Sequence, residues 1–255
     1  MAQQTLLQAR GIVKNFGHVR ALRGCDFDVY PGEVVAMIGD NGAGKSTLVK
    51  IIAGVQPPDN GELYFDGEPV TLADPTEAQA LGIETVYQDL ALAPDLDPAA
   101  NLFLGREVLK PGLIGKLGFL DTKAMTAKTL AAFKNLGAGV QSATAPVATM
   151  SGGQRQSIAV SRAATWADRL VIMDEPTAAL GVVQSRAVLE LIRRVRDQGI
   201  AVIIISHNMP EVLSVSDRVE VLRLGRRVAQ FVTADTDMEA LVAAMTGARV
   251  QEDAG

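Results

Sequence analysis

One stretch of the chain decides the fold: Val34-Val35-Ala36-Met37-Ile38-Gly39-Asp40-Asn41-Gly42-Ala43-Gly44-Lys45-Ser46-Thr47. Its first five residues are an unbroken apolar run, which is typical of a strand buried on both faces of a parallel sheet. The rest fits the pattern G-x-x-x-x-G-K-[ST] and opens a helical pattern. The glycines let backbone N–H groups face a phosphate, Lys45 can reach the β- and γ-phosphates, and the Ser46 hydroxyl can join a Mg²⁺ shell. A glycine-rich turn with a solvated lysine is the alternative, but the order of strand, loop and helix favours a phosphate-binding loop.

Two further apolar runs, residues 170–173 and 200–205, have the same strand character. Helical patterns follow them at 182–198 and after Asn208. On the helix at 182–198 we expect Glu190 and Arg194 to form an i,i+4 ion pair. Alternation of strand and helix indicates an α/β fold with a mostly parallel core sheet.

Two acids, Asp174 and Glu175, end the strand at 170–173, and Pro176 stops its continuation. In open α/β sheets ligands bind beyond the carboxyl ends of the strands. Asp174 is therefore predicted to hold Mg²⁺, directly or through water, and Glu175 to polarise the attacking water as general base. Acids in this position are often merely solvated, but the phosphate-binding loop upstream favours a functional role.

The composition is that of a globular chain without an excess of positive charge. Its 255 residues carry 24 bases and 29 acids, a formal charge of −5, which gives no reason to expect a nucleic-acid partner. The single cysteine, Cys25, cannot form an internal disulfide and fits a reducing compartment. Residues 1–16 lack the apolar core of a signal peptide, and every apolar run is far shorter than the about 20 residues of a membrane span. We therefore expect a soluble chain that reaches a membrane only through a partner.

The middle of the chain has a different character from the rest. Residues 89–167 are helical and loop-rich, and they are predicted to form a helical subdomain inserted into a nucleotide-binding core made of residues 1–88 and 168–250. Residues 1–250 then form a single domain, and residues 251–255 form a frayed tail.

Within the predicted insertion lies Met150-Ser151-Gly152-Gly153-Gln154-Arg155-Gln156. Ser151 and Gln154 fit a capping box that begins a helix, and the glycines expose backbone donors suited to a γ-phosphate. A helix cap without further function is the alternative. Together with the phosphate-binding loop and Asp174-Glu175-Pro176-Thr177, this stretch resembles the signature of ABC ATPases, a family of P-loop NTPases, from about residue 5 to residue 247. The resemblance implies an ABC ATPase domain with an N-terminal antiparallel β portion.

The resemblance assigns roles to three more residues. Phe16 matches the aromatic residue that stacks on adenine, and would otherwise be a core phenylalanine. Gln88 resembles the glutamine that contacts Mg²⁺, with Ser46 and Asp174, and links to the transmembrane partner; alone it would pass for a loop residue. His207 resembles the switch histidine that contacts the γ-phosphate, although lone histidines are usually structural.

Two positions depart from the family pattern. Met150 replaces the usual leucine, an apolar change that conserves volume and costs little. Gly181 stands where many ABC ATPases have an aspartate, in a loop that helps two subunits sense each other's sites.

The resemblance also implies cofactors, partners and a location. ATP with Mg²⁺ would be bound between the phosphate-binding loop of one subunit and residues 151–154 of a second copy, so that two chains form a sandwich dimer. Transmembrane permease subunits would receive the motion through Gln88 and the helical subdomain. A periplasmic or extracellular sugar-binding protein would deliver the solute, and the chain would lie peripherally at the cytoplasmic face of the inner membrane.

The substrate class is inferred from the resemblance alone. Three stretches are similar to monosaccharide importers of the ribose, xylose and fructose group: Gly82-Ile83-Glu84-Thr85-Val86-Tyr87-Gln88, Asn101-Leu102-Phe103-Leu104-Gly105-Arg106-Glu107 and Ser206-His207-Asn208-Met209-Pro210. The single cassette is similar to the fructose-like branch. An ATPase for another solute, and an ATP-switched protein without a membrane partner, remain as alternatives. The coiled coils or paired cassettes typical of the latter are not seen in this sequence.

Overall fold

The computed structural model describes residues 4–140 and 142–248. At its centre lies a six-stranded sheet with strand order β10-β9-β3-β8-β7-β6. Neighbouring strands are parallel except β9 and β10, which are antiparallel, so the predicted mostly parallel sheet is confirmed. The strands are β3 (Val34–Ile38), β6 (Ile83–Val86), β7 (Leu170–Asp174), β8 (Ala201–Ile205), β9 (Arg218–Arg223) and β10 (Arg226–Val232).

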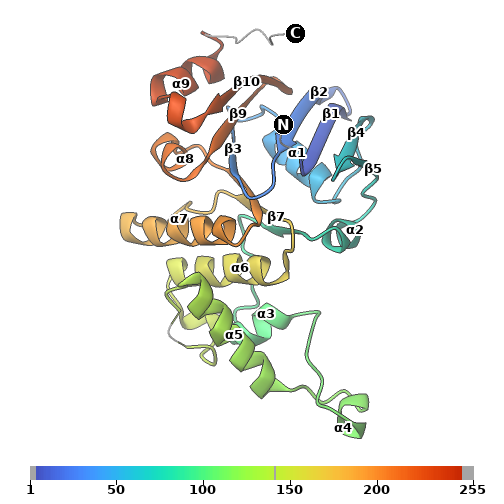
Figure 1. Cartoon of the computed structure of the whole chain (residues 1–255), viewed down its shortest axis with the longest axis vertical. Coiled ribbons are helices and arrows are strands. Elements are labelled where there is room, and N and C mark those ends of the chain that lie inside the picture. The colour runs from blue at the N-terminus through green and yellow to red at the C-terminus, as the bar shows by residue number, and fades with distance from the viewer. Residues whose placement is uncertain (1–3, 141, 249–255) are drawn as a thin grey trace.

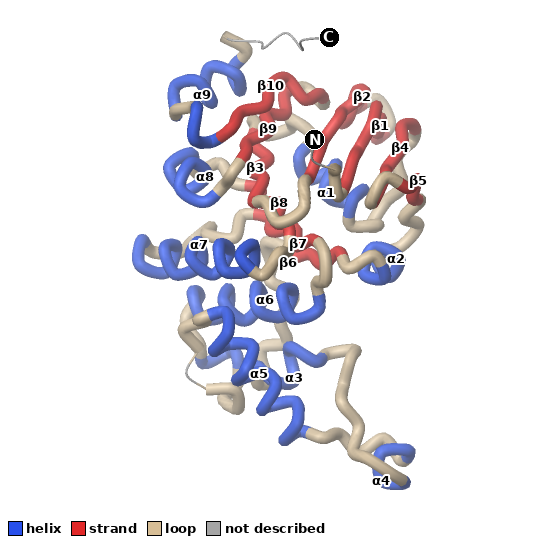
Figure 2. The backbone as a smooth tube through the Cα atoms, viewed as in Figure 1, coloured by secondary structure: helices blue, strands red, loops and turns tan. Residues whose placement is uncertain are grey.

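A second, antiparallel sheet holds the N-terminal part of the chain, as the resemblance implied. Its four strands lie in the order β2-β1-β4-β5. They are β1 (Leu7–Phe16), β2 (Val19–Val29), β4 (Asn60–Phe65) and β5 (Glu68–Val70). Figure 2 shows this sheet beside the central one, with α1 (Lys45–Ile52) next to it.

Side chains along the central strands alternate between two hydrophobic clusters, one on each face of the sheet. On β3, Val34 and Ala36 belong to the first cluster, whereas Val35 and Met37 belong to the second. The first cluster contains buried residues of α6 (Gly152–Trp166), α7 (Val182–Asp197), α8 (Met209–Val215) and α9 (Met238–Thr246), so we call this side the helical face. The second contains α1 and the antiparallel sheet, so we call it the sheet face.

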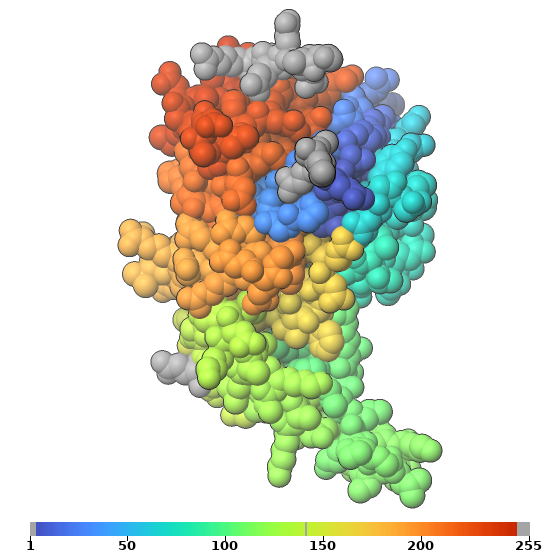
Figure 3. All heavy atoms as spheres, viewed as in Figure 1, coloured from blue at the N-terminus to red at the C-terminus, as the bar shows by residue number. Residues whose placement is uncertain are grey.

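A third cluster forms inside the helical subdomain, which runs between β6 and β7 in the chain. Phe103 packs edge-on against Trp166 with ring centroids 5.4 Å apart, and Trp166 donates a hydrogen bond to the carbonyl of Leu102 at 2.7 Å. The subdomain projects away from the two sheets (Figures 1 and 3). Its elements are α3 (Pro98–Phe103), α4 (Leu113–Lys116), α5 (Thr122–Leu136), the short helix Val147–Thr149 and α6. The remaining helices of the described chain are α2 (Pro75–Ala80) and a single turn at Thr233–Asp235.

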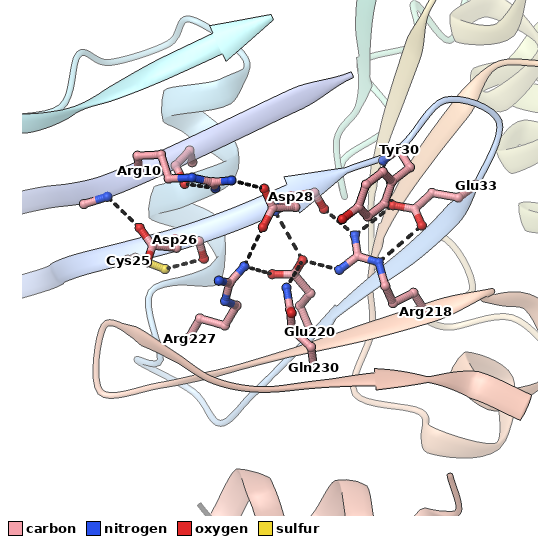
Figure 4. Close-up of polar contacts among 12 residues, drawn as sticks. Arg10, Cys25, Asp26, Asp28, Tyr30, Glu33, Arg218, Glu220, Arg227 and Gln230 are labelled. Atoms are coloured by element: carbon pink, nitrogen blue, oxygen red, sulfur yellow. Dashed lines mark hydrogen bonds and ion pairs between the residues drawn. The ribbon is translucent and has the colours of Figure 1, made fainter. Parts of the chain in front are cut away.

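Charged side chains join the two sheets in an inter-sheet network (Figure 4), formed by Asp28, Glu33, Arg218, Glu220 and Arg227. Arg227 contacts Asp28 at 2.8 Å and Glu220 at 3.5 Å, while Arg218 contacts Glu33 at 2.8 Å and also pairs with Glu220. Glu220 is fully buried, and burial raises its pKa while both arginines oppose that shift. The network therefore links β2 to β9 and β10.

One predicted contact is wrong. Glu190 pairs with Arg193, one position earlier than expected, at 3.0 Å. Arg194 instead donates to the carbonyl of Leu136 at 3.1 Å, because α5 lies within reach of this side of α7.

Two further features bear on expectations from the sequence. Cys25 is buried on β2, and burial, with Glu220 and Asp26 nearby, raises the pKa of its thiol to about 12. Within the described residues, no helix combines the length and apolar character that crossing a bilayer requires. The tail predicted at residues 251–255 lies outside the described residues.

Candidate active site

The phosphate-binding loop connects β3 to α1 at the carboxyl edge of the central sheet. Gly39 and Gly44 have φ angles of 151° and 103°, a region that favours glycine. A Cβ at Gly39 would lie 2.2 Å from the carbonyl oxygen of Leu222, so no larger residue fits without moving the backbone. The loop is closed by a hydrogen bond from the amide of Ala43 to the carbonyl of Asp40 at 3.0 Å. Asp40, Asn41, Gly42 and Ser46 are exposed, and Thr47 is half-buried.

Support for the loop comes from the turn between β9 and β10, which sequence reasoning missed. The amide of Gly225 donates to the carbonyl of Ala43 at 3.0 Å, and the amide of Arg23 donates to the carbonyl of Gly225 at 2.8 Å. A Cβ at Gly225 would lie 2.7 Å from the carbonyl oxygen of Ala21. The glycine in Leu224-Gly225 is a sequence signal for a turn, but the sequence does not indicate that this turn packs against the phosphate-binding loop.

The side chain of Lys45 folds back onto the phosphate-binding loop. Its Nζ donates to the carbonyls of Gly39 at 2.6 Å and Asp40 at 3.1 Å. Burial lowers the pKa of Lys45, while Glu175 and Asp174 oppose that shift. The ammonium thus faces the acid pair across the site, and its contacts with backbone carbonyls are ones that an anionic phosphate can replace.

The acid pair lies where β7 ends. Asp174 is the last residue of the strand, and the amide of Glu175 donates to the carbonyl of Ile205 on β8 at 2.9 Å. Glu175 has a φ of 50°, an uncommon value for a non-glycine residue, of a kind that often marks functional positions. Its Oε1 lies 2.9 Å from Nδ1 of His207, which follows β8. Two residues predicted separately from the sequence are thus in direct contact.

The predicted Mg²⁺ ligands offer a fitting donor set. Gln88 and Asp174 line one cavity of about 630 Å³, together with Asp89 and Ala91. Burial raises the pKa of Asp174, with Glu175 adding to the rise and Lys45 opposing it. Carboxylate, amide and hydroxyl oxygens, the last from Ser46, are the ligands that Mg²⁺ prefers.

The signature stretch begins α6, and its predicted capping box is confirmed. The Ser151 hydroxyl accepts from the amide of Gln154 at 3.3 Å, and Gln154 Oε1 accepts from the amide of Ser151 at 3.0 Å. Gly152 and Gly153 form the first turn, where a Cβ at Gly153 would lie 2.7 Å from Cγ of Gln184 on α7. Since α6 covers the helical face and α1 the sheet face, the structure does not pack these two helices against each other.

Two other positions singled out from the sequence, Phe16 and Gly181, lie at the ends of secondary-structure elements. Phe16 ends β1 with 49% of its surface exposed, and the Lys14 ammonium lies 6.0 Å from its ring centre. The neighbouring Asn15 and Gly17 line a cavity of about 850 Å³. Gly181 is the N-cap of α7 and offers no side chain to the helix, whereas an aspartate there would supply a capping carboxylate.

A glycine-lined loop between a parallel strand and a helix, its lysine, and an acid pair at the end of a nearby strand define a P-loop nucleoside triphosphatase. Comparison with known proteins narrows this class. The family model described as ABC transporter matches residues 22–178, and the chain belongs to this family.

Among curated relatives, the chain is 53% identical over 251 residues to the Fructose import ATP-binding protein FrcA of Rhizobium meliloti. The aligned region covers 98% of this chain and 96% of the relative. It is 44% identical to the Xylose/arabinose import ATP-binding protein XylG of Sulfolobus acidocaldarius, over 94% of both chains. The Ribose import ATP-binding protein RbsA 1 of Rubrobacter xylanophilus is 41% identical over 97% of this chain, which spans only 48% of that relative's length.

Among solved structures, a nucleotide-free ATP-binding cassette from an ABC transporter superposes with a TM-score of 0.78 at 25% identity, over 95% of each chain. The cbiO1 protein of Clostridium perfringens, described as part of an ABC transporter complex, superposes with a TM-score of 0.77 at 25% identity. Both likenesses span the core and the helical subdomain together, so the chain has the fold of an ABC ATP-binding cassette.

Proposed function

We propose that this chain is the ATP-hydrolysing subunit of an ABC importer for a monosaccharide, with a fructose-like sugar as the preferred candidate. The observation that carries the proposal is 53% identity to a fructose import ATP-binding protein along nearly the whole of both chains. The similar xylose and ribose importer ATPases support a simple sugar in general.

Within one subunit, the exposed face of the phosphate-binding loop and Lys45 bind the β- and γ-phosphates of ATP. Glu175 accepts a proton from the attacking water, and His207 orients that carboxylate through the 2.9 Å contact and reaches the γ-phosphate. Ser46, Gln88 and Asp174 would hold Mg²⁺, which when bound neutralises charge on the phosphate oxygens. Phe16 stacks on the adenine from its exposed position at the end of β1.

A second copy of the chain completes each site. Ser151 is exposed at the start of α6, and α6 does not pack against the α1 helix that follows the phosphate-binding loop, so we assign Ser151–Gln154 to the site of a second molecule. ATP then holds two subunits together because its γ-phosphate is contacted from both. Driving the pair from 1:99 to 99:1 closed takes about 5.5 kcal/mol of differential binding, which two shared nucleotides can supply.

Transmembrane permease subunits are the proposed partners, with a periplasmic or extracellular sugar-binding protein acting through them. The chain itself would lie peripherally at the cytoplasmic face of the inner membrane. Gln88 and Leu90 line a cavity of about 390 Å³ that also includes Gly152 and Arg155 of α6. Because this cavity joins the metal-binding side of the site to the helical subdomain, it is the proposed route by which closure reaches the permease.

The test is reconstitution. The chain is co-expressed with a candidate permease and sugar-binding protein from the same organism, and ATP hydrolysis is measured in proteoliposomes with different sugars. A monosaccharide, delivered by its binding protein, should stimulate hydrolysis, and Glu175→Gln should abolish the stimulation. Stimulation by a different solute class would replace the sugar assignment. Failure to co-purify with any multi-spanning protein would favour an ATP-switched protein without a membrane partner.

A further inference from the structure

The helical subdomain ends in a projecting segment, residues 109–120, which we call the lobe tip. It contains α4 and lies at the far end of the molecule from the two sheets (Figures 1 and 3). Its sequence is Leu109-Lys110-Pro111-Gly112-Leu113-Ile114-Gly115-Lys116-Leu117-Gly118-Phe119-Leu120. Half of these residues are large and apolar, yet the segment does not contribute to the three hydrophobic clusters of the described chain.

The apolar side chains of the lobe tip face solvent. Leu113, the first residue of α4, is 78% exposed, and Leu117, its C-cap, is 76% exposed. The amide of Leu117 donates to the carbonyl of Leu113 at 3.2 Å, so the two residues lie one helical turn apart on the same side. Ile114 and Phe119 are more than half exposed as well. A water-soluble surface rarely gathers such residues without a partner.

The lobe tip holds this shape before any partner arrives. The amide of Lys110 donates to the carbonyl of Phe119 at 2.9 Å, and Leu109 forms an antiparallel bridge with Leu120. Gly115 is buried against the carbonyl of Lys110, where a Cβ would lie only 1.7 Å from the oxygen. The base of the loop is therefore closed, and little further ordering is required on binding.

Charge indicates what the lobe tip contacts. It carries Lys110 and Lys116 and no acidic residue, a formal charge of +2 in a chain whose total is −5. Both lysines are exposed, and neither forms an ion pair with any residue that the structure describes. Leucine and phenylalanine side chains flanked by lysines are typical of segments that lie in the interface of an anionic bilayer.

We propose that the lobe tip inserts its apolar side chains into the headgroup region of an anionic membrane, a lipid contact separate from any contact with the permease. Leu113 and Leu117 enter the boundary between headgroups and acyl chains, and Lys110 and Lys116 lie against lipid phosphates. The contact goes beyond the proposed function, because it holds the ATPase at the bilayer even when permease and nucleotide are absent.

The test is co-sedimentation of the full chain with vesicles of phosphatidylglycerol and phosphatidylcholine in equal parts. Wild-type protein should bind these vesicles, should bind pure phosphatidylcholine far less, and should be released by salt. The double variant Leu113→Gln/Leu117→Gln should lose about tenfold or more of the partition coefficient. Lys110→Gln/Lys116→Gln should lose roughly 25-fold at low salt, about fivefold per lysine.

A matched control pair lies on α9, where Met238 and Val242 are also exposed and spaced i,i+4. Met238→Gln/Val242→Gln should bind vesicles like the wild type. The proposal is overturned if the wild type does not sediment with anionic vesicles, or if the lobe-tip and α9 variants behave alike.

Other binding partners of the lobe tip would give different results in these experiments. If Leu113→Gln/Leu117→Gln abolishes self-association of the chain but not vesicle binding, the surface contacts a second copy and the proposal fails. If the same variant loses the permease in detergent while binding vesicles normally, the surface contacts protein and the proposal also fails. ATP hydrolysis in solution should be equal in all of these variants, so failure of the lipid contact is distinguishable from failure of the proposed function.

Discussion

Replacing Arg218 by methionine should destabilise the fold far more than removing a surface ion pair. The Arg218 guanidinium pairs with Glu33 and Glu220, donates to the carbonyl of Asp28 at 2.5 Å, and lies 5.1 Å from the ring centre of Tyr30. Methionine fills most of the space but supplies no donor. Glu220, which is fully buried, would keep only Arg227 and its remaining hydrogen bonds.

Removing one partner of a buried ion pair costs about 3–5 kcal/mol, because the other charge stays desolvated. For a chain of this size that free energy corresponds to a fall in Tm of about 2–4 °C per kcal/mol, or roughly 6–20 °C in total.

The sign of the pH dependence of this stability loss follows from Glu220. Burial raises the pKa of Glu220, and Arg218 opposes that rise. Loss of the arginine therefore raises the pKa further. The folded variant then holds a proton that the unfolded chain releases, and its stability falls as pH rises above about 4.3.

Thermal and guanidinium unfolding of the nucleotide-free chain, followed by circular dichroism at pH 5 and pH 8, measures the loss. The matched control is Arg169→Met, which removes a 2.6 Å pair with Asp66 whose side chains are 42% and 43% exposed. This control should cost no more than about 1 kcal/mol. Equal losses for the two variants, or an Arg218→Met deficit that shrinks toward pH 8, would refute the reasoning.

Three further predictions concern the nucleotide site. Glu175→Gln should retain ATP binding and lower hydrolysis by roughly 10²–10⁴, the range for a lost acid–base group; unchanged phosphate release would remove Glu175 from the role of base. Lys45→Ala should weaken ATP binding about 10–100-fold, since a hydrogen bond to a charged group is lost, as measured by nucleotide titration; undiminished affinity would exclude the proposed phosphate contact. Gly39→Ala should lower nucleotide affinity because its Cβ would lie 2.2 Å from the Leu222 carbonyl, with circular dichroism checking that the fold persists; a variant that binds ATP normally would show that the loop can shift at no cost.

The features that the sequence predicted are local ones. The apolar run from Val34 to Ile38 is β3 to the residue, since a strand buried on both faces needs apolar side chains at each position. The capping box of Ser151 and Gln154 spans a single helical turn, so its two residues meet whenever the helix forms. The contact between Glu175 and His207 was not predicted. Glu175 was singled out because it follows a strand, and His207 because it resembles the switch histidine of the family.

What the sequence could not predict depends on packing between distant segments. Gly225 supports the phosphate-binding loop from 182 positions beyond Ala43, and only the arrangement of β9 beside β3 brings the two together. Glu220 lies on β9 between β10 and β3, and its full burial depends on β2, where the amide of Asp28 donates to its carboxylate at 3.2 Å. The expected pair of Glu190 with Arg194 failed because neighbouring arginines compete for one carboxylate, and surface pairs of this kind differ little in energy.

The buried thiol of Cys25 has a practical consequence. With a pKa of about 12 and no exposure to solvent, this group forms almost no thiolate near neutral pH and should resist alkylating reagents. A cysteine introduced at an exposed position of α5, such as Lys128→Cys, would then be the reactive thiol of the described chain. Spin labels or fluorophores attached there would test whether the helical subdomain moves when nucleotide binds, in a protein whose native cysteine is left in place.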